Sequence, residues 1–144
     1  NRKYLVLEED SFQIGSGEKF GKIVSDPLAS NGIALELFHP EYAWTPKIYF
    51  RPPMVYGKKY DCYFAVRLSK AATGGFWEFS HWTGREVVHS KHFGSEDKVP
   101  VNRYIYIPAG RITVGNSGYM FFAGKKNPEL KSTLVDHFLM VEAE

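Results

Sequence analysis

The sequence predicts one all-β domain over residues 1–144, an antiparallel β-sandwich of jelly-roll type. Short runs rich in aromatic and β-branched residues recur along the chain, and Gly, Pro and Asn turns separate them. No window has an apolar stripe of helical period, and only Asn127–Lys131 could form a helical turn. A chain of 144 residues can bury a core without disulfides.

About ten short strands are expected, because turn residues punctuate the apolar runs. The clearest is Lys59–Leu68, in which Tyr60, Cys62, Phe64 and Val66 share one face. The predicted strands are Tyr4–Phe12, Phe20–Val24, Ile33–Phe38, Lys47–Arg51, Lys59–Leu68, Phe76–Trp82, Arg85–His89, Arg103–Ile107, Arg111–Val114, Tyr119–Phe122 and Leu134–Val141. The breaks between them include Gly15-Ser16-Gly17, Asp26-Pro27, Asn31-Gly32, Pro52-Pro53, Gly74-Gly75 and Thr83-Gly84.

Charge and composition exclude several classes of partner. The net charge is +2, and no basic cluster with interleaved aromatic residues indicates nucleic-acid binding. No apolar run approaches the ~18 residues of a membrane span. Cys62, the single cysteine, is expected to be a small buried residue. The chain starts at Asn1 without a signal peptide, so we expect a processed protein or a domain from a longer one.

Acidic residues lie near both ends of the chain. If the first and last strands pair, Glu8 and Asp10, which share one face of a strand, meet Asp136. Carboxylates at close range repel one another unless a cation lies between them, and hard oxygen ligands suit calcium. These three residues are therefore candidate ligands of a structural calcium ion; the alternative is that they are solvated acids at a strand edge.

The aromatic content, 16%, suits both a β-sheet core and the stacking of sugar rings. Tyr42 and Trp44 lie between two proline breaks, so we expect a surface loop whose rings contact a ligand or fold back over the core. Trp77 and Trp82 lie on opposite faces of one strand, which predicts one core residue and one exposed residue. Arg85 is a candidate polar contact to a sugar beside them.

Further polar residues are candidates for sugar binding or for metal chemistry. Asn127, in the turn before the last strand, is a second candidate polar contact, and His81 is a third. A small jelly-roll enzyme is an alternative that would need a metal bound by His81, His89 and His92. No Gly-x-Ser-x-Gly motif is present to supply a nucleophile.

Several motifs, in their order along the chain, resemble the β-jelly-roll carbohydrate-binding modules, especially families six and thirty-five, which are similar to galactose-binding domains. The first is the opening acidic strand Leu7–Phe12, and the last is the aspartate strand Leu134–Leu139. Between them lie a turn of small residues, a strand that begins with glycine and tyrosine and ends in arginine, and a glycine before a further strand: Asp26–Gly32, Gly57–Leu68 and Tyr106–Val114.

The resemblance implies a non-catalytic module that binds carbohydrate and targets a glycan-active enzyme, with the catalytic domain in the same or an associated polypeptide. It also implies calcium at Glu8, Asp10 and Asp136, a monomer, and an extracellular, cell-surface or periplasmic location. The sequence departs from the family at Ser132 and Thr133, where such modules often have an asparagine that contacts sugar. The alternative function is a protein–protein interaction or structural domain of an extracellular or viral assembly.

Overall fold

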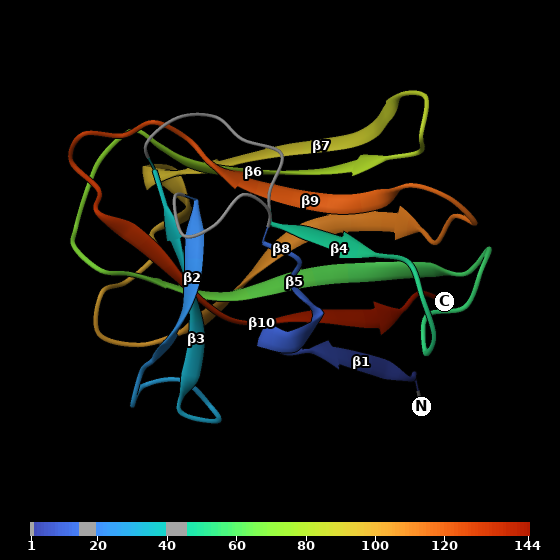
Figure 1. The fold of residues 1–144 in the computed structure, drawn as a ribbon, viewed down its shortest axis with the longest axis horizontal. Coiled ribbons are helices and arrows are strands. Elements are labelled where there is room, and N and C mark those ends of the chain that lie inside the picture. The colour runs from blue at the N-terminus through green and yellow to red at the C-terminus, as the bar shows by residue number, and fades with distance from the viewer. Residues whose placement is uncertain (1, 15–19, 40–45) are drawn as a thin grey trace.

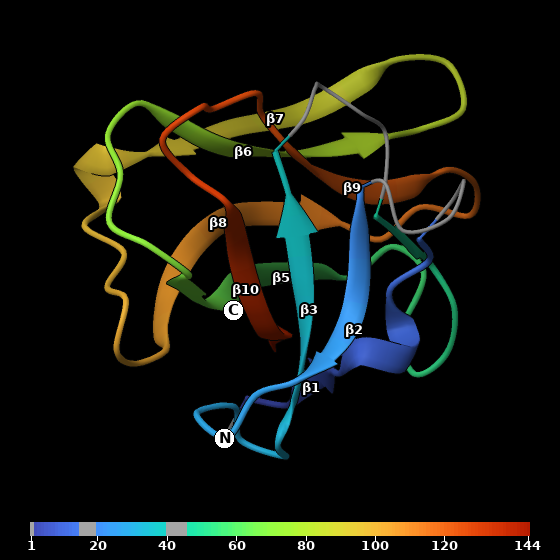
Figure 2. The same ribbon diagram turned by 60° about the vertical axis from the view of Figure 1, so that its left-hand side comes forward.

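The computed structural model describes residues 2–14, 20–39 and 46–144 and confirms the predicted fold class, an antiparallel β-sandwich. Two sheets pack face to face, with β2 and β3 beside β10 at one end (Figures 1 and 2). The elements are β1 (Tyr4–Leu7), η1 (Glu9–Ser11), β2 (Gly21–Ser25), β3 (Ile33–Phe38), β4 (Lys47–Tyr49), β5 (Lys59–Leu68), β6 (Gly75–Trp82), β7 (Val87–Gly94), η3 (Ser95–Asp97), β8 (Ile105–Thr113), β9 (Tyr119–Gly124) and β10 (Ser132–Glu142).

The larger sheet has the order β2-β3-β10-β5-β8, and β1 pairs with β10 beyond the end of β3. The smaller sheet has the order β4-β9-β6-β7. The antiparallel pairing of β1 with β10 brings the two ends of the chain to one side of the molecule (Figure 1). Within the described ranges, neither short helix has the length or the apolar character needed to cross a membrane.

Two predicted boundaries differ from the structure. The first strand ends at Leu7, and Glu9–Ser11 form the 3-10 turn η1 instead of continuing the strand. The two strands predicted around Pro108-Ala109-Gly110 form one strand, β8. Proline is tolerated there because β8 is an edge strand, and a bulge opposite Cys62 and Tyr63 accommodates the extra residue.

Aromatic rings fill the space between the sheets. Phe64 of β5, beside the central strand β10 of the larger sheet, is fully buried and faces the smaller sheet. Its ring centroid lies 4.7 Å from that of Phe138, 4.9 Å from that of Phe122 and 5.3 Å from that of Phe79. Cys62 is buried as predicted, and burial raises the pKa of its thiol well above its usual range. A large share of the aromatic content therefore belongs to the core.

Candidate functional site

An aromatic row crosses the outer face of the smaller sheet. Tyr49 of β4 is directly opposite Tyr119 of β9, and Tyr119 is directly opposite Trp82 of β6. Phe79, three residues before Trp82, points into the core, so the alternation of a strand places Trp82 on the outer face. The rings of Tyr49 and Tyr119 meet edge to face at 5.6 Å. Trp82 and Tyr119 are partly exposed, and Tyr49 is 42% exposed.

Polar groups share this face. The hydroxyl of Ser90 donates a hydrogen bond to the Glu78 carboxylate at 2.9 Å, and the hydroxyl of Ser80 donates another at 3.2 Å. The ammonium of Lys47 lies 4.4 Å from the centroid of the Tyr119 ring. A partly exposed row of rings beside oriented acceptors and a cation can stack on a flat ligand and hydrogen-bond its edges.

The structure separates the two tryptophans as predicted, but it corrects the prediction that Trp77 contacts a ligand. Trp77 is 1% exposed and stacks on Phe93 with a centroid distance of 4.9 Å. Its ring belongs to the core because it lies on the inner face of β6. Trp82 is partly exposed and can contact a ligand, and Arg85 is exposed in the adjoining turn. Tyr42 and Trp44 lie outside the described residues.

The prediction that Asn127 contacts a sugar is also wrong, because its side chain is buried and holds loops together. Its amide donates to the carbonyl oxygens of Thr73 at 2.8 Å and Gly75 at 2.9 Å. Its side-chain oxygen accepts from the backbone N–H of Glu129 at 3.0 Å. With these groups paired, Asn127 has a structural role and is 7% exposed.

The alternative metal site at three histidines does not form in the described part of the chain. His81 and His89 are cross-strand partners, but His89 is three residues before His92, so the two point to opposite faces of β7. The ring of His89 reaches the Ala109 carbonyl oxygen at 2.8 Å, whereas His92 lies beside Lys125. Burial lowers the pKa of His81, with a smaller contribution from His89.

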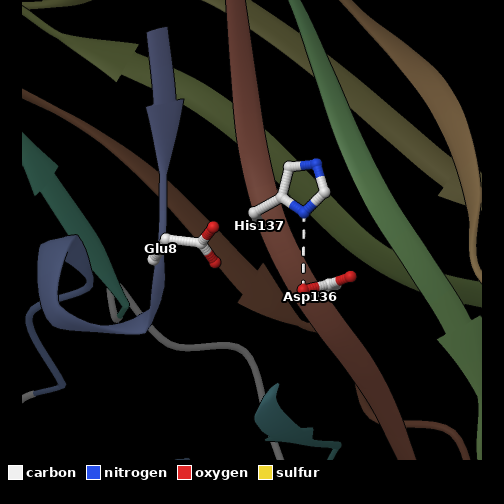
Figure 3. A group of neighbouring side chains, drawn as sticks. All are labelled: Glu8, Asp136 and His137. Carbon is white, nitrogen blue, oxygen red and sulfur yellow. Dashed lines mark ion pairs between the residues drawn. The ribbon is translucent and has the colours of Figure 1, made fainter. Parts of the chain in front are cut away.

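A second candidate site lies where β1 ends beside β10. Figure 3 shows the Glu8 side chain reaching from the end of β1 toward Asp136 and His137. One ligand atom from each of the three residues lies within 4.8 Å of the others. The register of β10 against β5 shifts between Val135 and His137. This bulge explains how Asp136 and its neighbour His137 face the same group instead of alternating.

The Asp136 carboxylate is 3% exposed and ties the turn after β2 to the last strand. It accepts hydrogen bonds from the Ser30 N–H at 2.8 Å and from the Ser30 hydroxyl at 3.0 Å. Burial raises the pKa of Glu8; the His137 ring opposes this shift, whereas the charge of Asp136 adds to it. A cation between these groups would relieve that repulsion.

The predicted ligand set is therefore only partly assembled. Glu8 and Asp136 converge, but Asp10 is exposed on η1 because the strand ends before it. The third donor in the group is the His137 ring, which was not among the ligands predicted from the sequence. Two carboxylates match the hard oxygen ligands of calcium, whereas an imidazole nitrogen does not.

No protein-family model and no curated protein matches the sequence. Solved structures do match the fold. A family 35 carbohydrate-binding module from Clostridium thermocellum has a TM-score of 0.62 at 12% identity, covering 96% of this chain and 98% of that one. The C-terminal family 6 module of the laminarinase LamC from Zobellia galactanivorans has a TM-score of 0.59 at 13% identity, covering 97% and 100%.

A Podospora anserina β-(1,4)-mannanase with a family 35 module has a TM-score of 0.64 at 10% identity. The match covers 98% of this chain but 28% of the mannanase chain. The fold is thus the β-sandwich of carbohydrate-binding modules, as the resemblance implied.

Proposed function

We propose that this protein is a non-catalytic carbohydrate-binding module and that its ligand lies on the outer face of the smaller sheet. The proposal depends chiefly on the row of Tyr49, Tyr119 and Trp82, which crosses three neighbouring strands. Flat aromatic rings match the apolar C–H faces of sugars, and charged and hydroxyl groups such as Glu78 can hydrogen-bond the sugar hydroxyls.

The similarity of fold to modules of polysaccharide-degrading enzymes supports the same proposal. We propose that the domain works as a monomer outside the cytoplasm and brings a glycan-active catalytic domain to its polysaccharide. That catalytic domain would belong to the same polypeptide or to an associated one. A row of rings that crosses three neighbouring strands suits an extended chain of sugars better than a single enclosed residue.

The first test is replacement of Trp82 by alanine. A panel of polysaccharides that includes mannan and laminarin should yield a ligand with a dissociation constant between micromolar and millimolar, about −4 to −8 kcal/mol. The Trp82→Ala variant should bind it at least tenfold more weakly, a loss of about 1.4 kcal/mol, because one stacking surface is removed. Isothermal titration calorimetry measures both values.

Tyr4 supplies the matched control. It is 66% exposed and lies on β1 of the larger sheet, whereas the aromatic row lies on the smaller sheet. Tyr4→Ala should leave the affinity unchanged. A panel without any ligand, or equal losses in the two variants, would reject the proposed face and favour a protein-interaction or structural role.

We also propose that a divalent cation joins the ends of the chain through Glu8 and Asp136, an arrangement that we call the cation clip; the family resemblance implies calcium. A cation that binds only the folded chain stabilises it by about 2.7 kcal/mol at a hundredfold excess over its dissociation constant. Protein that is denatured, stripped with chelator and refolded should melt about 5–10 °C lower than the loaded protein.

Variants test whether these carboxylates cause the effect. Glu8→Gln should abolish the difference between loaded and stripped protein in a calorimetric scan. Asp10→Asn should retain the difference, because Asp10 is exposed outside the cluster. Identical melting curves for loaded and stripped wild-type protein would show that the clip does not exist.

A further inference from the structure

We propose that His137 supplies a nitrogen ligand to the cation between Glu8 and Asp136, so that this site prefers a borderline transition ion such as zinc over calcium. The inference rests on the proposed cation clip and concerns which cation the clip takes. Calcium is bound by six to eight oxygen atoms, whereas zinc takes four ligands that commonly combine imidazole nitrogen and carboxylate oxygen.

The geometry of the three donors favours the smaller ion. The Nδ1 atom of His137 lies 3.4 Å from Oδ1 of Asp136. Two ligands of a tetrahedral zinc, at ordinary Zn–N and Zn–O lengths, are about 3.4 Å apart. Glu8 contributes the third donor of a group in which one ligand atom from each residue lies within 4.8 Å of the others, and a fourth position remains for water or a backbone oxygen.

The His137 ring provides a second, independent indication of a ligand. Its side chain is 9% exposed, and Nδ1 is buried without a hydrogen-bond partner among the described residues. A buried nitrogen left unpaired costs about 1–3 kcal/mol. Because this nitrogen points at the Asp136 carboxylate (Figure 3) and Glu8 belongs to the same group, a metal ion placed there would satisfy all three side chains at once.

The surrounding residues resemble the outer shell of a metal centre. The Nε2 atom of His137 lies 2.5 Å from the hydroxyl of Tyr106. When Nε2 carries the proton and donates it to that oxygen, Nδ1 has a free lone pair for a metal. The backbone N–H and hydroxyl of Ser30 hold Asp136, so two of the three donors are oriented before any ion binds.

Metal titrations of stripped, refolded protein test the proposal. Isothermal titration calorimetry with zinc chloride and with calcium chloride should give one zinc per chain, bound at least tenfold more tightly than calcium. His137→Gln should remove that preference. His92→Gln is the matched control, because His92 is exposed on β7, and it should bind zinc like the wild type.

Two further measurements remain informative if His137→Gln does not fold. Tyr106→Phe removes the outer-shell hydroxyl at an exposed position and should weaken zinc binding by about tenfold. In protein labelled with ¹⁵N-histidine, one equivalent of zinc should shift the Nδ1 resonance of His137 by NMR.

The outcomes separate this inference from the proposals on which it rests. Calcium binding as tight as zinc binding, or an unchanged His137 resonance, would overturn the nitrogen ligand and leave the clip in place. If neither ion binds, both the clip and the inference are wrong. Glycan affinity, measured separately on the other sheet, does not depend on either result.

Discussion

Replacing Trp77 by alanine is expected to lower the free energy of unfolding by about 3–5 kcal/mol, the usual cost of deleting a buried aromatic side chain. Trp77 is 1% exposed and stacks between Phe93 at 4.9 Å and Phe76 at 6.3 Å. Its edge also meets Phe64 of the opposite sheet, with 6.5 Å between the ring centroids. The cavity left by the indole would therefore remove contacts from both layers of the sandwich.

Urea denaturation followed by tryptophan fluorescence measures this loss, and Trp82 offers the control in the same strand. Trp82→Ala should change the free energy of unfolding by less than about 1 kcal/mol, since Trp82 lies on the outer face. The two variants should thus affect different properties: Trp77→Ala reduces stability, and Trp82→Ala reduces glycan affinity. Loss of affinity without loss of stability in a Trp77→Phe variant would contradict the assignment of Trp77 to the core.

The alternation of apolar and polar residues, with turn residues between the runs, was sufficient to predict the fold class. In β5 the predicted inner residues are all buried, because alternation along a strand maps directly onto the two faces of a sheet. Ala65, on the opposite face, is buried as well. Its burial depends on the position of β5 in the sheet, between β10 and β8. The sequence of a single strand does not indicate that position.

The sites depend on features that only the assembled sheets reveal. The aromatic row requires the register of β4 against β9 and of β9 against β6, so Tyr49 and Tyr119 did not appear as partners of Trp82 in the sequence. The bulge in β10 turns His137 toward Asp136, whereas strict alternation would place them on opposite faces. Asp10 lies on the 3-10 turn η1 and not on a strand, so it is outside the group of Glu8, Asp136 and His137.

Asp26 was predicted only as a turn residue, yet it holds a buried charged network. Asp26 is 3% exposed, and its carboxylate lies 2.9 Å from the Arg67 guanidinium and 2.5 Å from the Tyr104 hydroxyl, which donates to it. The backbone N–H of Leu28 adds a hydrogen bond at 3.0 Å. This network joins the turn after β2 to β5 and to the segment before β8.

Asp26→Ala is therefore expected to lower the free energy of unfolding by about 3–5 kcal/mol, because the substitution leaves the Arg67 charge without its buried partner. The control is Asp61→Ala. Asp61 pairs with Arg111 at 2.8 Å, but the Arg111 side chain is 52% exposed, and such surface pairs contribute about 0–1 kcal/mol. Similar losses from the two substitutions in urea denaturation would mean that Asp26 is no more than a surface charge.

The pH dependence of stability provides a second test of the Asp26 network. Burial opposes its ionisation, but hydrogen bonds from Tyr104, Leu28 and Arg67, together with the Arg67 charge, outweigh burial and hold the pKa of Asp26 below its ordinary value. Its stabilisation is therefore complete above the unfolded-state pKa of about 4 and is lost as the pH falls through the lower folded-state pKa. Unfolding free energies measured from pH 7 to pH 2 should fall less steeply in Asp26→Asn than in the wild type. Equal slopes would show that the carboxylate has the same proton affinity in the folded and unfolded chains, and the network would then have no electrostatic role in stability.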